Sequence, residues 1–297
     1  MPQPITTRRI EANGLTFEVD ECGGGDNIAI CLHGFPESRF SWRHQLPALA
    51  ELGWRAIAPD TRGYGNSSRP LGKANYKIAA LMDDVAGLFE AVGAKRRLLI
   101  GHDWGGIIAW AYAMERRTPL DGLVVMNAPH LAVFADLMRR SWRQKMKSWY
   151  MGFFQVPGLP EALMLANHGK LITTSFTREA VDKSRFPPEV TEVYRKNALI
   201  PGAITAMVNY YRANVLDMAR FSATEQMPID VPTLLIWGEA DGFMGVEATQ
   251  GYEPYVKDFT LRRLPGVSHW VQQEAPERVN EILSGWLEAR LPLQSKA

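Results

Sequence analysis

The stretch LLIGHDWGGIIAW, residues 98–110, sets an acidic residue, Asp103, inside a run that is otherwise typical of buried core. An ionised carboxylate in such surroundings costs several kcal/mol unless it is paired, hydrogen-bonded or used in chemistry. An apolar run, a polar pair and two glycines before a second apolar run predict a strand, a tight turn and a helix. This order matches the nucleophile elbow G-x-S-x-G, with aspartate in the position of the serine.

Asp103 has two interpretations at this turn. As a nucleophile, it would be raised above the sheet at a helix N-terminus, where the helix dipole and free N–H groups stabilise a negative charge. An ionised carboxylate there can attack without a general base. As an N-cap, it would only bond to the first turn of the helix, which is common at such junctions. The stretch alone leaves both interpretations open.

Strands and helices alternate on both sides of this turn. Two strands within residues 8–25 are joined at Asn13–Gly14, a strong hairpin dipeptide. Further strands are expected at 27–34, 54–60, 96–103, 121–129, 231–241 and 259–269, with helices at 41–53, 77–92, 105–117 and 276–291. This pattern predicts an α/β protein with a mainly parallel sheet that is flanked by helices on both faces.

Residues 131–225 interrupt the alternation and are expected to form an inserted helical lid on a core made of residues 1–130 and 226–297. The segment is helix-like and rich in Met, Trp and Tyr. An apolar stripe recurs at helical spacing and is expected to pack mostly as core. The stripe comprises Met138, Trp142, Met146, Trp149 and Phe153, and an opposite, solvated face carries Arg139, Arg140, Arg143 and Lys147.

The composition is that of an ordinary globular protein. The chain has 297 residues, of which 46% are hydrophobic and 22% charged, and a formal net charge of +1. The near-neutral balance predicts neither nucleic acid nor a membrane as partner. The two cysteines, Cys22 and Cys31, are expected to be buried thiols. The first residues lack the apolar core of a signal peptide, so we expect a soluble cytoplasmic protein. The oligomeric state stays open, a homo-oligomer included.

An acid and a histidine follow the elbow in the order that nucleophile elbows require. Asp241, in WGEADGF, comes directly after a buried strand, and His269, in PGVSHW, lies in the loop after the last strand. Both are therefore expected at the carboxyl edge of the sheet beside Asp103. The turn CLHGFPES suggests that the N–H groups of Phe35 and Trp104 form an oxyanion hole. The elbow contains no serine, which argues against a serine hydrolase.

Over essentially its whole length the chain resembles the epoxide hydrolases of the α/β-hydrolase fold. The motifs HGFPES, DTRGYGNSSRP, GHDWGG and GVSHWVQQEAPE are similar to the core motifs of that family. In the expected lid, YMGFFQVPG puts Tyr150, and NYYRA puts Tyr211, where these enzymes carry their two lid tyrosines. The neighbouring Tyr210 is expected to serve packing.

The resemblance implies a catalytic triad and a covalent mechanism without metal or organic cofactor. Asp103 would open a small-molecule epoxide while Tyr150 and Tyr211 donate to the departing oxygen. His269, oriented by Asp241, would then activate water to hydrolyse the alkyl ester and release a vicinal diol. The aromatic lid favours a mainly apolar substrate.

Two related activities and one non-enzymatic role remain as alternatives. Haloalkane dehalogenases share the Asp-Trp elbow, but they usually carry Asn where this chain has Phe35 and do not need the tyrosine pair. Fluoroacetate dehalogenases carry an arginine directly after the nucleophile, where this chain has Trp104. A ligand receptor on the same scaffold would not need the triad and both tyrosines. Halide release measured against diol formation separates these alternatives.

Overall fold

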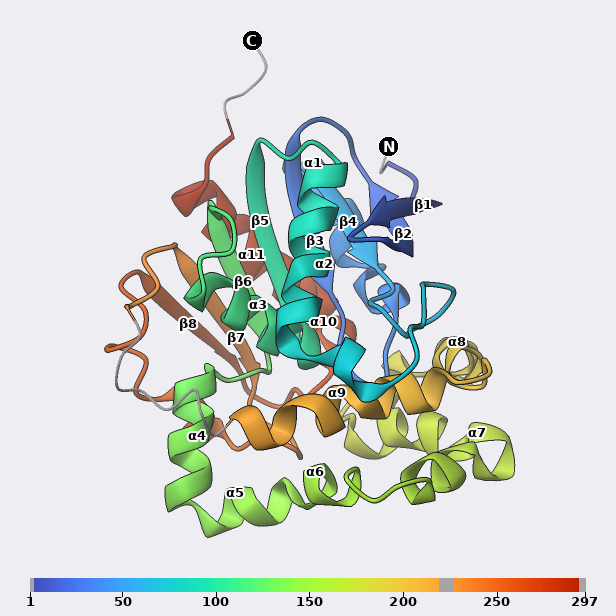
Figure 1. The fold of residues 1–297 in the computed structure, drawn as a ribbon. Helices are drawn as coiled ribbons and strands as arrows, with labels where there is room; N and C mark the ends of the chain where they lie inside the picture. Colours follow the sequence, from blue (N-terminus) through green and yellow to red (C-terminus); the bar gives the residue numbers. More distant parts are fainter. Residues whose placement is uncertain (1–2, 219–226, 294–297) are drawn as a thin grey trace.

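The computed structural model describes residues 3–218 and 227–293 and contains one eight-stranded sheet (Figure 1). The strands are ordered β1-β2-β4-β3-β5-β6-β7-β8. The strand β2 pairs antiparallel with β1 and β4, and the other neighbouring strands pair parallel, so the expected mainly parallel sheet is confirmed. The strands are β1 (Thr6–Ala12), β2 (Leu15–Cys22), β3 (Asn27–Leu32), β4 (Arg55–Pro59), β5 (Arg96–His102), β6 (Gly122–Met126), β7 (Thr233–Gly238) and β8 (Phe259–Leu264).

Each face of the sheet packs against its own helices. In β3, Ile28 and Ile30 belong to one apolar cluster, and Ala29 and Cys31 belong to the other, as the alternation of side chains along a strand requires. The first cluster includes α2 (Ile78–Ala91) and α3 (Trp104–Met114), and the second includes α1 (Gln45–Glu51) and α11 (Pro276–Arg290). Both sheet faces are therefore covered, and the carboxyl edge is left to carry functional groups.

Between β6 and β7 the chain leaves the sheet and forms a helical insertion across one end of it (Figure 1). The expected boundary between lid and core, between residues 225 and 226, lies within the segment 219–226, which is outside the described residues. No helix in the described part of the chain combines the length and apolar content needed to cross a membrane. The insertion comprises α4 (Leu131–Arg140), α5 (Trp142–Lys147), α6 (Trp149–Phe153), α7 (Leu159–Glu179), α8 (Pro188–Ala198) and α9 (Ala203–Met218).

The prediction that the apolar stripe of the insertion packs as core is wrong for three of its five residues. Trp142, Met146 and Trp149 are 73%, 57% and 65% exposed. The segment is not one helix, because it is divided into α4, α5 and α6 at Ser141 and Ser148. The buried face of α5 instead carries Gln144.

Gln144 anchors α5 through hydrogen bonds to the loop that follows β7. Its side-chain amide donates to the carbonyl of Phe243 (2.9 Å) and accepts from the N–H of Gly245 (3.0 Å). A polar side chain that finds partners in the loop therefore decides which face of α5 is buried, and helical spacing alone does not reveal this.

The turn from β5 to α3 is possible only because small residues let backbones approach closely. A Cβ on Gly105 would overlap the carbonyl of Leu32 in β3, and a Cβ on Gly101 would overlap the carbonyl of Gly105. Between them, Asp103 adopts φ 50° and ψ −119°, a strained conformation for a residue with a side chain. The packing of α3 against the sheet thus holds Asp103 at the top of the turn.

Replacing Gly105 with Ala should lower the free energy of unfolding by about 2 kcal/mol or more, because the new methyl group meets backbone that cannot move aside. Gly285→Ala is the matched control on the exposed face of α11, where a Cβ has open space. It should raise the free energy by about 0.5–1 kcal/mol. Urea unfolding of both variants measures the difference, and equal effects would contradict the close-packing argument.

Candidate active site

Asp103 occupies the N-cap position of α3 but its side chain makes no hydrogen bond to that helix. Its Oδ1 instead accepts the N–H of Phe35, in the loop after β3, at 2.8 Å. The cap interpretation therefore does not describe what this carboxylate does. Trp104, at the first position of α3, has a backbone N–H without an acceptor inside its own helix, as every helix start has. The N–H groups of Phe35 and Trp104, which are expected to form an oxyanion hole, thus come one from each of the two segments that meet at Asp103.

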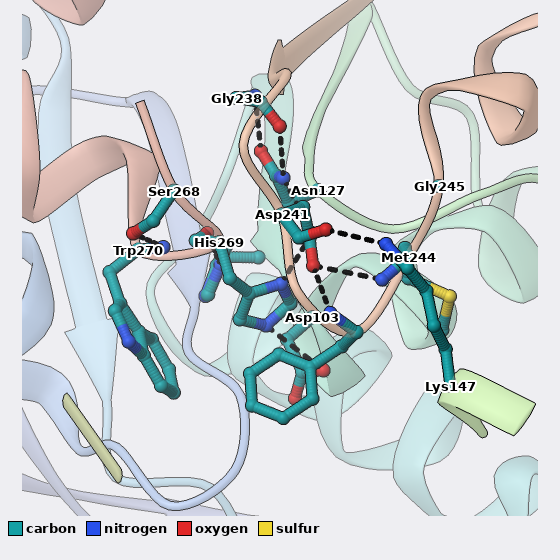
Figure 2. A network of polar contacts seen from close by, with 12 residues as sticks. Asp103, Asn127, Lys147, Gly238, Asp241, Met244, Gly245, Ser268, His269 and Trp270 are labelled. Carbon is teal, nitrogen blue, oxygen red and sulfur yellow. Dashed lines mark hydrogen bonds and ion pairs between the residues drawn. The ribbon is translucent and has the colours of Figure 1, made fainter. Parts of the chain in front are cut away.

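The structure brings Asp103, His269 and Asp241 together although they come from three different loops (Figure 2). Nε2 of His269 lies 3.5 Å from Oδ2 of Asp103, and Nδ1 lies 2.7 Å from Oδ2 of Asp241. Because the Asp241 carboxylate accepts a hydrogen bond from Nδ1, the ring is oriented with Nε2 toward Asp103. Carboxylate, imidazole and carboxylate form one continuous chain.

Asp241 is held by a set of donors that the sequence did not single out. Asn127, directly after β6, donates from its amide to Oδ2 of Asp241 at 2.7 Å. The Oδ1 atom accepts the N–H groups of Phe243 (2.7 Å) and Met244 (2.8 Å). Asn127 is locked in turn, because its Oδ1 accepts the N–H of Gly238 at 2.9 Å (Figure 2). The only sequence signal for Asn127 was its position after a strand in VVMNAP.

The charges of the three residues stabilise one another in a buried environment. Burial alone would lower the pKa of His269, but Asp241 and Asp103 on either side of the ring raise it well above the usual range. For Asp103, burial acts to raise the pKa, yet the hydrogen bond and charge of His269 bring it below the usual value. The pKa of Asp241 is lowered in the same way. Asp103 is therefore ionised, as a nucleophilic carboxylate must be.

A second buried pair, Glu37 and His102, lies behind the triad and was also missed from the sequence, although both residues stand in the quoted motifs. His102 bonds through Nδ1 to Glu37 (2.7 Å) and through Nε2 to the backbone carbonyl of His269 (2.8 Å). Glu37 also accepts the N–H of Gly34 (2.9 Å) and the side-chain amides of Gln272 and Gln273 (both 2.8 Å).

The partners of this pair fix the orientation of the His102 ring. A carbonyl only accepts, so Nε2 donates to His269, while Nδ1 faces the Glu37 carboxylate, which also accepts from three other donors. Burial acts to raise the pKa of Glu37, but the charge and hydrogen bond of His102 hold it below its usual value. The pair therefore holds the backbone of His269 in place from behind the triad.

Two tyrosines of the insertion face the triad. Tyr150, on α6, and Tyr211, on α9, line the same cavity as Asp103 and His269, and their rings lie 6.0 Å apart at 81°. Burial, followed by the charge of Asp103, raises the pKa of both phenols, so both stay protonated. The neighbouring Tyr210 turns away and donates to the backbone carbonyl of Arg62 at 2.8 Å.

The cavity lies between the carboxyl edge of the sheet and the insertion and has a volume of about 800 Å³. Most of its lining is apolar, contributed by α6, α7 and the loop after β3, with Phe35, Trp149, Phe154 and Ile172 among the contacts. Its size is that of a small-molecule site. In the described ranges, no group of three or more His, Cys, Asp or Glu side chains is arranged to hold a metal ion.

Comparisons with known proteins agree over nearly the whole chain. Residues 29–276 match the family described as alpha/beta hydrolase fold. "Epoxide hydrolase 4" of Homo sapiens is 37% identical over 281 residues, which are 93% of this chain and 76% of that protein. The "AB hydrolase superfamily protein YfhM" of Bacillus subtilis is 34% identical, with coverages of 94% and 96%. A crystal structure of a Bacillus megaterium epoxide hydrolase with an inhibitor is similar with a TM-score of 0.85 and 28% identity, covering 95% of this chain and all of that one.

Replacing Glu37 with Ala should lower the free energy of unfolding by about 3–5 kcal/mol, because it leaves the buried His102 ring and three further donors without an acceptor. The matched control is Asp230→Ala, which breaks an exposed ion pair with Arg116 and should cost less than about 1 kcal/mol. Denaturant unfolding of both variants measures the two costs. A Glu37 variant as stable as the control would show that these buried hydrogen bonds do not stabilise the fold.

Proposed function

Since the chain belongs to the epoxide hydrolase family of the α/β-hydrolase fold, we propose that it converts an epoxide to a vicinal diol through an alkyl ester on Asp103. The observation that carries this proposal is the environment of Asp103. One oxygen accepts a backbone N–H, and the other faces His269 in a cavity that two protonated phenols also line. A carboxylate that only capped a helix would need none of these neighbours.

In the first step, Oδ2 of Asp103 attacks an oxirane carbon, and the C–O bond to that carbon breaks. The departing alkoxide is a poor leaving group, so it needs a hydrogen bond or a proton as the bond breaks. Tyr150 and Tyr211 supply the donors. Their raised pKa values favour this role, because the phenols remain donors while Asp103 stays ionised.

In the second step, water attacks the carbonyl carbon of the ester, and His269 takes its proton. The free enzyme holds His269 between two carboxylates, which raise the pKa of the ring. Ester formation removes the negative charge of Asp103, so the pKa of His269 falls and the ring becomes available as a base. The N–H groups of Phe35 and Trp104 stabilise the oxyanion that develops on the former carboxylate.

The helical insertion acts as the lid of this site, with residues 131–225 as lid and 1–130 with 226–297 as hydrolase core. The lid contributes the tyrosines and most of the apolar wall, and the core contributes the charged groups. An apolar wall of this extent fits a substrate that is mainly apolar around the oxirane.

Changing Tyr150 or Tyr211 to Phe should slow the alkylation of Asp103 by roughly 10- to 1000-fold, the scale for losing one donor to a developing oxyanion. The double variant should be nearly inactive on epoxides. Tyr210→Phe is the control from the same helix as Tyr211, because its hydroxyl bonds to Arg62 outside the cavity. Stopped-flow fluorescence in single turnover measures the rates. Normal epoxide hydrolysis by the double variant, together with halide release from haloalkanes, would favour a dehalogenase instead.

His269→Ala should stop the reaction after the first step, because Asp103 can still attack but no base activates water. Intact-protein mass spectrometry should then detect a mass gain equal to one substrate molecule. A digest of the same protein should locate the added mass on the peptide that contains Asp103. A double variant that also carries Asp103→Asn should gain nothing. Steady turnover by His269→Ala, or diol formation without a mass gain, would contradict the covalent mechanism.

A further inference from the structure

Four charged side chains that the proposed reaction does not use line the cavity, and two of them, Arg143 and Arg178, are exposed. The other two are Lys147, at the end of α5, and Glu179, at the end of α7. The ammonium of Lys147 donates to the backbone carbonyl of Asp241 at 2.9 Å. The carboxylate of Glu179 lies against Gly242, where an added Cβ would overlap its Oε2. The two side chains therefore flank the Asp241–Gly242 peptide.

Both side chains keep unused hydrogen-bonding capacity. Within residues 3–218 and 227–293, the Glu179 carboxylate has no hydrogen bond or ion pair, only longer-range charge interactions. Burial raises the pKa of Glu179, and the charge of His269, the next cause, acts to lower it. Lys147 uses one of its three N–H donors on the Asp241 carbonyl. A half-buried carboxylate without a partner beside an apolar cavity indicates a ligand contact.

We propose that Lys147 and Glu179 form a polar subsite that binds a hydroxyl or primary carboxamide at the end of the substrate remote from the oxirane. This inference rests on the proposed epoxide hydrolysis and names the substrate class. A group that both donates and accepts pairs with the carboxylate and the ammonium at once. A full charge on the substrate would be attracted by one side chain and repelled by the other.

The same wall penalises substrates that end in a hydrocarbon. A methyl end would shield the Glu179 carboxylate from solvent without giving it a hydrogen bond. A site with an unpaired polar group rejects the analogue that lacks the matching group. The apolar remainder of the cavity accommodates the chain between the two polar ends. The cavity therefore selects epoxides that are apolar in the middle and carry a neutral polar terminus.

The test uses a series of terminal epoxides of increasing chain length, each prepared with an ω-hydroxyl, an ω-methyl and an ω-carboxylate end. Wild-type kcat/KM should favour the ω-hydroxyl over the ω-methyl compound by at least about 10-fold at one chain length. Glu179→Leu should lose this preference and hydrolyse the ω-methyl compound as fast as wild type or faster, which also proves that it is folded. Glu179→Gln, which keeps a polar amide, should retain part of the preference. Glu281→Leu, on the exposed surface of α11, is the control and should behave as wild type.

Three results overturn the inference and leave the proposed function intact: equal wild-type rates on ω-hydroxyl and ω-methyl epoxides, a preference that survives in Glu179→Leu, or a stronger preference for the ω-carboxylate. The last would assign the wall to Lys147 and the exposed Arg178, which also lines the cavity. If wild type forms no diol from any epoxide in the series, the proposed function itself fails.

Discussion

The buried negative charge of Asp103 is the constraint on which the surrounding structure depends. A charge at this depth is tolerated only if it is paired and hydrogen-bonded. The core meets this condition because Asp103 and Asp241 enclose His269, and Glu37 pairs with His102. Each of these three carboxylates also accepts backbone N–H donors. The cost of burying these groups is thus offset within the core itself.

The position of the triad could be predicted from the sequence because it follows from local geometry and chain order. A strand, a turn and a helix define the elbow, and in a parallel sheet the loops after successive strands meet at one edge. Asp241 and His269 both follow strands, so their position beside Asp103 can be predicted without knowing how the side chains pack. The parallel sheet was predictable for the same reason, since alternating strands and helices admit few other arrangements.

What could not be predicted depends on contacts between segments that are distant in the chain. Glu37 and His102 are 65 residues apart, and the role of each exists only through the other. Asn127 supports Asp241 across 114 residues. In the insertion, the apolar spacing predicted which face is buried. Gln144 instead forms hydrogen bonds with the loop after β7, so the face of α5 that carries Gln144 is the buried one. The spacing of apolar residues predicts that a segment is helical, but the hydrogen bonds of a buried polar side chain can decide which face of the helix is buried.

The division of groups between core and insertion has a chemical reason. In the proposed reaction Asp103 must remain ionised and able to attack. His269 already pairs with it from one side, so a second cation above it would lower its nucleophilicity further. Phenols avoid this, because they donate hydrogen bonds without carrying charge, and burial, followed by the charge of Asp103, raises their pKa and keeps them protonated. Lys147, a cation of the insertion that lines the cavity, donates to the backbone carbonyl of Asp241. In the proposed function, neutral donors over Asp103 and charged groups along the wall would allow one cavity to bind a polar terminus and still leave the carboxylate reactive.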